Sequence, residues 1–213
     1  MKDLNNQTSY WDSVASDKTF THPVDMEKFS SFVQPDKRIL DYGCGYGRIC
    51  EALWAKGYRE IVGFDTSQAM IKRGKSDHPH LHLQVFPTEI EDSSFDAIIL
   101  MAVLTCIPEN DAQKSLISDI HRMLRPGGIV FISDYWLQRD DRNRQRYDDA
   151  KDKYETYGIF ELSEGAIFRH HERQWIEELM ADFGTIDLID IDVFTMNGHE
   201  ARAFQYFGRK KES

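Results

Sequence analysis

The chain has few cysteines, no long apolar run and a shortage of basic side chains. Its three cysteines, Cys44, Cys50 and Cys106, are odd in number and lack metal-ligand spacing, which favours reduced thiols over disulfides or a metal site. No apolar stretch approaches the ~20 residues that span a bilayer, and no secretory signal pattern opens the sequence. We therefore expect a cytoplasmic protein with no bound metal and no membrane partner.

The charge balance is acidic, with 36 Asp and Glu residues against 26 Lys and Arg and a formal net charge of -10. Such a surface argues against a protein that grips a phosphate backbone, so we expect no nucleic-acid partner. At 213 residues the chain is long enough for one domain with a sizeable core. The sequence gives no indication of the oligomeric state.

One stretch, residues 38–48, organises the sequence. A short apolar strand pattern runs into a loop with glycine at every second position, Gly43, Gly45 and Gly47, and a helical pattern follows at once. Glycine is used where the backbone takes φ > 0 or where another group approaches the main chain closely. The helix that follows begins with free N–H groups and the positive end of its dipole. The stretch therefore predicts a binding loop for a polar or anionic group.

Two kinds of nucleotide-binding loop compete for this stretch. A dinucleotide fingerprint requires G-x-G-x-x-G, and that third glycine is absent. The pattern Asp41-x-Gly43-x-Gly45-x-Gly47 instead resembles motif I of the class I S-adenosylmethionine (SAM) dependent methyltransferases. Residues 62–67, 94–99 and 124–128 resemble later motifs of that family, in the family's order and spacing.

The resemblance implies an α/β fold with a Rossmann-like, seven-stranded, mostly parallel sheet, an antiparallel last strand and helices on both faces. Hydrophobic patterns predict parallel strands at residues 38–42, 60–65, 81–86, 95–101 and 129–133. Two final strands, 185–194 and 200–208, are joined through Asn197-Gly198, a strong hairpin signal. Such a terminal hairpin also argues against a dehydrogenase domain, which continues with another crossover helix.

Helices are predicted to begin at Pro23 and Pro108, with the second ending at residues 125–128, and a last helix is predicted over 172–183. We expect one domain over residues 1–213. Residues 1–37 form an N-terminal helical cover, and residues 137–171 form an inserted lid on the ligand side of the sheet. The first half of this insertion mixes Arg and Asp residues, which is typical of a solvated helix face.

SAM is the cofactor that the resemblance implies. Asp65 lies 20 positions after Gly45, at the carboxyl end of the second strand, where nucleoside cofactors present ribose hydroxyls to a carboxylate. A helix-capping role is the alternative for Asp65. The other expected cofactor-binding residues are Tyr10, Trp11, Asp41, Gly43, Cys44, Gly45, Thr66, Thr88, Glu89, Ile90 and Met101.

Two groups in this set carry alternatives. Tyr10 and Trp11 either cap the core or close over the cofactor, as N-terminal aromatics often do in the resembled family. That family often has an aspartate after the third strand, bonded to adenine, and this chain has none there. Thr88, Glu89 and Ile90 are therefore expected to border the adenine.

Arg169, His170 and His171 are the expected catalytic residues. In this hypothesis the arginine holds an oxyanion of the acceptor while a histidine accepts a proton from the nucleophile. Adjacent side chains point in different directions on a helix or strand, so all three serve one ligand only in a loop. The alternative is that a histidine caps the helix predicted at 172–183.

The activity implied by the resemblance is SAM-dependent methyl transfer (EC 2.1.1 type). The expected acceptor is an O, N or S atom of a small molecule, with anionic molecules included. No Asn/Asp-Pro-Pro-Tyr/Phe loop follows residues 95–101, which argues against methylation of DNA-base amines. The alternatives are an enzyme that acts on RNA or protein and a non-catalytic SAM-binding regulator.

Overall fold

A computed structural model describes residues 7–87 and 89–211. In chain order its elements are α1 (Thr8–Val14), α2 (Met26–Phe32), β1 (Ile39–Tyr42), α3 (Arg48–Ala55), β2 (Ile61–Asp65), α4 (Gln68–Asp77), β3 (His82–Val85), β4 (Phe95–Met101), the 3-10 turn η1 (Leu104–Cys106), α5 (Asn110–Met123), β5 (Leu124–Tyr135), α6 (Asp141–Ala150), β6 (Ile159–Glu161), β7 (Ile167–Arg169), α7 (Arg173–Leu179), β8 (Phe183–Phe194) and β9 (Glu200–Lys210).

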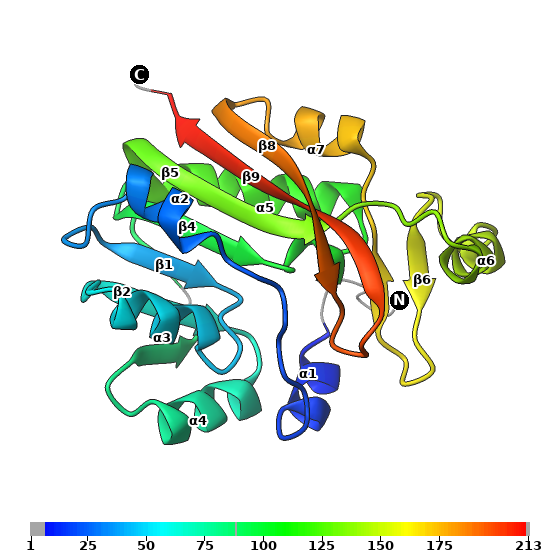
Figure 1. The fold of residues 1–213 in the computed structure, drawn as a ribbon, viewed down its shortest axis with the longest axis horizontal. Coiled ribbons are helices and arrows are strands. Elements are labelled where there is room, and N and C mark those ends of the chain that lie inside the picture. The colour runs from blue at the N-terminus through cyan, green and yellow to red at the C-terminus, as the bar shows by residue number, and fades with distance from the viewer. Residues whose placement is uncertain (1–6, 88, 212–213) are drawn as a thin grey trace.

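A seven-stranded sheet in the order β3-β2-β1-β4-β5-β9-β8 forms the centre of the molecule (Figure 1). β1 to β5 pair in parallel, and β9 is antiparallel to both β5 and β8. The chain order reverses between β1 and β4, so the carboxyl ends of these two strands lie beside each other at the switch point of the sheet. Ligands bind at such a point in open α/β sheets. The predicted fold class is confirmed.

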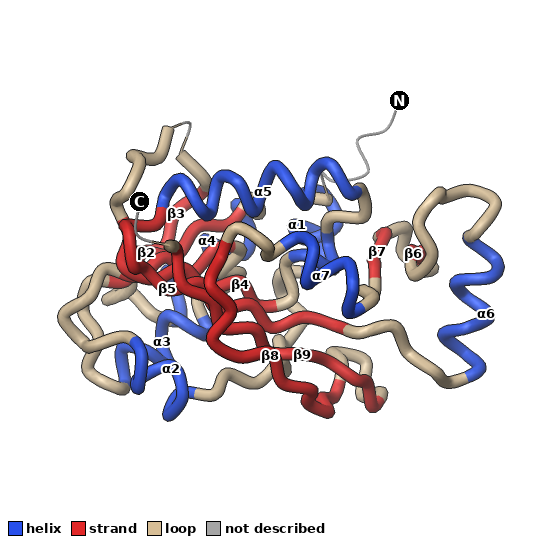
Figure 2. The backbone as a smooth tube through the Cα atoms, turned by 90° about the horizontal axis from the view of Figure 1, so that it is seen from above, coloured by secondary structure: helices blue, strands red, loops and turns tan. Residues whose placement is uncertain are grey.

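Consecutive residues of the central strands pack on opposite faces of the sheet. Ile98 and Leu100 of β4 belong to a core cluster with α5 and α7, whereas Ala97 and Ile99 belong to a cluster with α2 and α3. Figure 2 shows α5 and α7 on one side of the sheet and α2 and α3 on the other. β4 is apolar at nearly every position because both of its faces are covered.

The N-terminal segment supplies two short helices. The helix predicted to begin at Pro23 begins three residues later at Met26, because the Asp25 side chain accepts from the N–H of Lys28 and caps the helix there. α1 lies against α4 instead, where Asp12 Oδ1 accepts from Ser67 Oγ at 2.6 Å. The segment thus spans from the core to the ligand side of the sheet.

Residues between β5 and α7 extend the molecule at one end. They form α6 and the two-stranded β6–β7 hairpin, which lie beyond the carboxyl ends of the central strands (Figures 1 and 2). β7 also contacts η1, which follows β4. This insertion therefore borders the carboxyl ends of the central strands.

Some predicted boundaries were wrong. The stop assigned to residues 125–128 belongs to β5, which begins at Leu124 opposite Phe95 and is seven residues longer than predicted; Gly127 takes φ 76° within it. The last helix ends at Leu179, so β8 begins at Phe183. Among the described helices, none is long and apolar enough to cross a membrane.

Replacing Phe131 with alanine tests the apolar core on the face of the sheet covered by α2 and α3. The ring is fully buried and stacks on Phe207 with centroids 4.4 Å apart. Phe131→Ala should lower the free energy of unfolding by about 3–5 kcal/mol, because it removes buried apolar surface and leaves a cavity. Urea unfolding followed by circular dichroism measures this loss.

Phe194→Ala is the matched control, since this ring is 59% exposed. Its unfolding free energy should stay within about 0.5 kcal/mol of the wild type. If Phe131→Ala does not fold, Phe131→Leu is measured instead, and its free energy of unfolding should fall by less. Equal losses at the two phenylalanines would contradict the placement of this core.

Candidate active site

The glycine loop after β1 is held by β2. The N–H groups of Gly43 and Cys44 both donate to the carbonyl of Phe64, at 2.8 and 2.9 Å. Gly43, Gly45 and Gly47 all have positive φ, between 54° and 85°, a region that disfavours other residues. The loop is therefore built from glycines because of its backbone conformation.

A close neighbour adds a second reason at Gly45. A Cβ atom there would overlap Cε2 of Phe20, whose ring stacks on Tyr46 with centroids 5.0 Å apart. Phe20 thus covers the outer side of the loop. The N-terminal segment and the loop are packed too closely for any side chain at this position.

Asp65 ends β2 and faces the loop. Its carboxylate accepts from the backbone N–H of Gly45 at 2.8 Å and from that of Ser67 at 2.8 Å. Burial raises the pKa of Asp65. Each carboxylate oxygen has two lone pairs, so each retains acceptor capacity for a ligand after these bonds are made.

Asp41 is the second carboxylate at this end of the sheet. It is 1% exposed, and the Cys50 thiol donates to its Oδ2 at 3.3 Å. Burial raises the pKa of Asp41 to about 7. A carboxyl group so poorly solvated is stabilised in its charged form by any cation that enters beside it.

One cavity of about 360 Å³ joins these groups to the rest of the ligand side. It runs from Gly43 and Asp65, past the end of β4, to Tyr135 at the end of β5 and on to α6 and β7. Ala102, directly after β4, has φ 54°, a strained conformation for a residue with a side chain. Such strain at a cavity wall is a common feature of binding sites.

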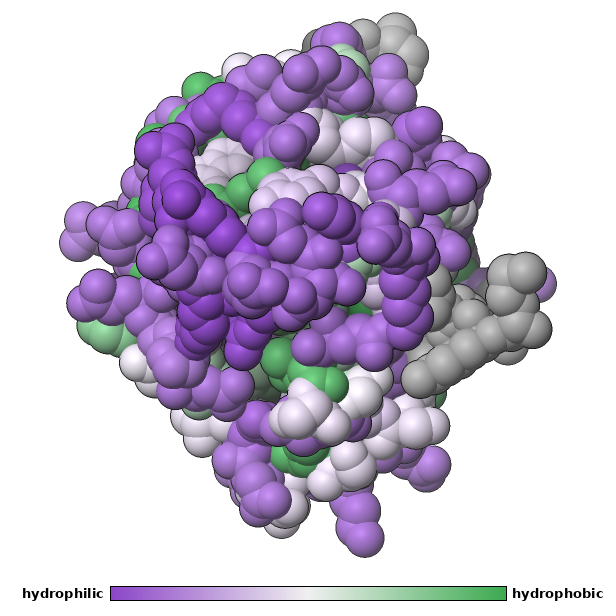
Figure 3. Space-filling model, turned by 90° about the vertical axis from the view of Figure 1, so that its right-hand side faces the viewer, coloured by the Kyte–Doolittle hydropathy of each residue, from purple (hydrophilic) through white to green (hydrophobic). Residues whose placement is uncertain are grey.

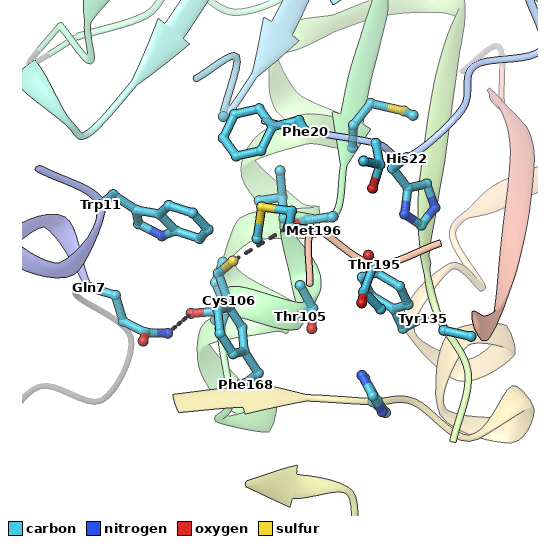
Figure 4. A pocket seen from close by; sticks show the side chains of 18 of the residues that line it. Gln7, Trp11, Phe20, His22, Thr105, Cys106, Tyr135, Phe168, Thr195 and Met196 are labelled. Carbon is cyan, nitrogen blue, oxygen red and sulfur yellow. Dashed lines mark hydrogen bonds between the residues drawn. The ribbon is translucent and has the colours of Figure 1, made fainter. Parts of the chain in front are cut away.

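Aromatic rings from distant segments close the cavity (Figure 4). Trp11 of α1 packs edge-on against Phe20 and against Phe168 of β7, with centroids 6.0 and 6.2 Å apart. The amide of Gln7 bonds to the carbonyl of Cys106 at 2.9 Å and to both backbone groups of Ile167. The N-terminal segment is thereby fixed to the inserted hairpin.

His22 and Arg48 belong to the cavity wall and carry buried nitrogens that lack a hydrogen-bond partner among the described residues. Arg48 donates to the His22 carbonyl at 2.5 Å, but its Nε has no partner among the described residues, and neither does either ring nitrogen of the 4% exposed His22. Burial, followed by the charge of Arg48, lowers the pKa of His22 to about 3. Buried polar groups without partners are rare, so these atoms indicate a polar ligand.

Most of the cofactor residues expected from sequence meet at this cavity. Its wall includes Trp11, Asp41, Gly43, Cys44, Asp65, Thr66 and Met101. Gly45 supports the loop through its bond to Asp65. Tyr10 lies outside the wall, where its ring packs on Phe168, and it belongs to the apolar cluster of the cover.

The residues expected to border adenine are placed differently. Thr88 lies outside the described residues. Glu89 is exposed and Ile90 packs against the core cluster beneath α5, so neither belongs to the cavity wall. Phe86 does, and its ring contacts Tyr42 with centroids 4.5 Å apart.

The expected catalytic trio is divided by the fold. Arg169 Nη1 donates to the carbonyl of Pro108 at 3.0 Å and to Asn110 Oδ1 at 2.7 Å, outside the cavity wall. His171 is buried against Gln113. The fold turns these two side chains away from the cavity wall, because successive residues of an extended chain face opposite sides, so that Arg169 and His171 share the side opposite His170 and both contact buried groups there.

His170 alone of the three lines the cavity. Its Nδ1 lies 2.5 Å from the Tyr147 hydroxyl, and burial lowers its pKa to about 3. The imidazole is therefore neutral near pH 7. It is suited to orienting a ligand by hydrogen bonding, while its low pKa makes it a weak base.

Several wall residues were missed from sequence. They are Phe20, His22, Arg48, Met70, Phe86, Arg142 and Arg146. Arg48 directly follows a motif glycine and Phe86 is the last residue of a predicted strand, so the positions of these two residues in the sequence were a usable signal. The others are brought in by segments that are distant in sequence. Among the described residues, no group of three or more His, Cys, Asp or Glu is placed to hold a metal ion.

Comparisons with known proteins agree with this geometry. A family model described as a methyltransferase domain matches residues 25–185, more than half of the chain. The carboxy-S-adenosyl-L-methionine synthase of Actinobacillus succinogenes is 30% identical over 121 residues, 52% of this chain and 49% of that protein. The human eEF1A lysine and N-terminal methyltransferase is 26% identical over 110 residues, 46% of this chain and 16% of that protein.

The chain thus spans about half or less of the length of these curated relatives. Among solved structures, a SAM-dependent methyltransferase from Methanosarcina mazei matches with a TM-score of 0.82 and 22% identity, covering 87% of this chain and 98% of that chain. At that identity the likeness shows the fold.

Replacing Asp41 with asparagine tests the buried carboxyl group through pH. Because the folded-state pKa of Asp41 is raised to about 7 from 3.8, the folded protein keeps a proton that the unfolded chain releases between these values. Its contribution to stability is therefore full below pH ~4, falls by about 1.4 kcal/mol per pH unit up to pH ~7, and is then constant. Asp41→Asn should remove this slope.

The measurement is the difference in unfolding free energy between wild type and Asp41→Asn, from pH 4 to 8 without ligand. The variant should gain stability relative to wild type as pH rises. Asp36→Asn, which changes an exposed carboxylate, is the control. A constant difference for Asp41→Asn would mean that its carboxyl group is solvated.

Proposed function

The chain belongs to the methyltransferase-domain family of class I SAM-dependent enzymes, and from this premise we propose that it transfers a methyl group to an O, N or S atom of a small molecule held in the cavity. The observation that carries the proposal is the continuity of that cavity. It begins at the glycine loop and extends beyond the ends of β4 and β5 to the inserted segment. Donor and acceptor therefore have adjoining spaces under one cover.

The residues present fit SAM. The glycine loop contributes Gly43, which has no side chain, to the cavity wall, and Asp65 retains lone pairs for the two ribose hydroxyls. Met70 and Phe86 supply apolar surface for an adenine ring on the same wall. These groups would hold the adenosine part.

The amino-acid part has its own partners. The unsatisfied nitrogens of His22 and Arg48 would bind a carboxylate, and the buried Asp41 would be neutralised by an ammonium group. Both signs of charge are thus available at the end of the cavity nearest the loop. This matches a zwitterionic amino-acid moiety.

SAM supplies a methyl group on a positively charged sulfur, which leaves as a neutral thioether. The protein therefore mainly has to hold the acceptor atom within ~3–3.5 Å of the methyl carbon and exclude water. Trp11, Phe20 and Phe168 provide an apolar enclosure for this purpose. The neutral His170 would orient the acceptor by a hydrogen bond.

The experiment supplies methyl-labelled SAM together with one of three fractions of a cell extract: low-molecular-mass metabolites, total RNA or total protein. We expect S-adenosylhomocysteine (SAH) release and label transfer with the metabolite fraction. Label in RNA or protein would favour a macromolecular acceptor. Binding of SAM with no release from any fraction would favour a non-catalytic regulator.

Replacing Asp65 with asparagine tests the ribose contact. The amide keeps one acceptor oxygen but loses the negative charge, so SAH binding should weaken by roughly tenfold to a hundredfold, in line with about 1.5–3 kcal/mol for a charged hydrogen bond. Isothermal titration calorimetry gives the dissociation constant. Asp92→Asn is the control, because that carboxylate is exposed and pairs with Arg122. An unchanged affinity for Asp65→Asn would remove Asp65 from this role.

A further inference from the structure

The cavity wall carries its carboxylates at one end and a pair of arginines at the other, in addition to Arg48 near the glycine loop. Its acidic side chains among the described residues are Asp41 and Asp65, at the carboxyl ends of β1 and β2. At the other end, α6 contributes Arg142 and Arg146. The chain as a whole has a net charge of -10, so a cationic wall goes against its overall composition.

The two arginines lie four residues apart and therefore share one face of α6. Nη1 of Arg142 is buried and has no hydrogen-bond partner among the described residues. Arg146 Nη1 makes a long contact of 3.5 Å with Asn143 Oδ1, and its guanidinium lies 5.4 Å from the centre of the Phe160 ring. Like charges at this spacing repel each other, which a bound anion would offset.

The nearest carboxylate does not satisfy this pair. Asp140 Oδ1 is 3.8 Å from Nε of Arg142, but Asp140 also caps α6 by accepting from the backbone N–H of Asn143 at 3.1 Å and from its amide at 2.7 Å. Asp140 lies outside the cavity wall. Within the part of the chain that the structure describes, the Nη1 group of Arg142 therefore has no acceptor.

The pKa of His170 reflects the positive charge of the same two arginines inside the cavity. Burial is the main cause of its lowered pKa, and the charges of Arg146 and Arg142 lower it further, against an opposing effect of Asp140. The surface over this end is mostly hydrophilic, with apolar residues between (Figure 3). Phe160, Leu162 and Phe168 give the adjoining inner wall an apolar character.

We propose that Arg142 and Arg146 bind an anionic group, a carboxylate or a phosphate, on an acceptor whose body is apolar. This rests on the proposed function, in which the α6 end of the cavity holds the acceptor. Guanidinium groups suit both anions because their planar donors match two oxygens at once. The apolar wall beside them accommodates the rest of the molecule.

The test measures binding of matched probes to the full chain saturated with SAH. Benzoate and phenyl phosphate are the anionic probes, and benzamide is the neutral counterpart. We expect at least one anionic probe to bind about tenfold or more tightly than benzamide. A preference for benzoate or for phenyl phosphate identifies which anion the site takes.

Two variants connect the preference to α6. The double substitution Arg142→Gln, Arg146→Gln should abolish the anionic preference, with the affinity for SAH unchanged. Arg144→Gln is the matched control, because Arg144 is an exposed residue of the same helix outside the cavity wall. It should keep the preference, which excludes a general effect of net charge.

The outcomes separate the two proposals. If SAH itself fails to bind, the proposed function fails first. If SAH binds but benzamide binds as well as the anions, or no probe binds, the anionic acceptor is overturned. The anionic acceptor is also overturned if the double variant still binds the anionic probes more tightly than benzamide. The wild-type comparison stands even if the double variant does not fold.

Discussion

The glycine loop is held in place by hydrogen bonds from β2, and the rest of the site depends on this constraint. The carbonyl of Phe64 accepts hydrogen bonds from two loop N–H groups, and the Asp65 carboxylate accepts a third from the N–H of Gly45. These bonds require left-handed backbone at the loop glycines. The same carboxylate then faces the cavity. Loop conformation and ligand binding are thus set by one pair of adjacent strands.

The sheet order gives this pair its functional position. Because the strand order reverses between β1 and β4, the helices that follow these two strands, α3 and α5, lie on opposite faces of the sheet, and the cavity lies at the carboxyl ends between them. Segments far apart in sequence then close it. Gln7 joins the N-terminus to β7, and Thr21 Oγ1 donates to the Phe194 carbonyl at the end of β8. Unlike the glycine loop, the residues that cover the cavity share no local sequence pattern.

The accuracy of the sequence-based expectations follows this division. Strands β1 to β5 and the loop were recognisable because apolar runs and glycine spacing are local features. The stop expected at residues 125–128 was wrong because Leu124 pairs with Phe95, a contact that no local pattern shows. Arg169 was expected at the acceptor from its chemistry alone. Its partners, Pro108 and Asn110, lie about sixty residues away in the chain.

The sequence by itself determined the fold class, the glycine loop and the carboxylate at the end of β2, because local motifs and hydrophobic patterns indicate each of them. Only the tertiary structure decided which side chains line the far end of the cavity. There α6 turns Arg142 and Arg146 inward and leaves Arg144 outside, although the three look alike in a run of mixed charges. The direction of a side chain depends on what its helix packs against, and that partner is distant in sequence.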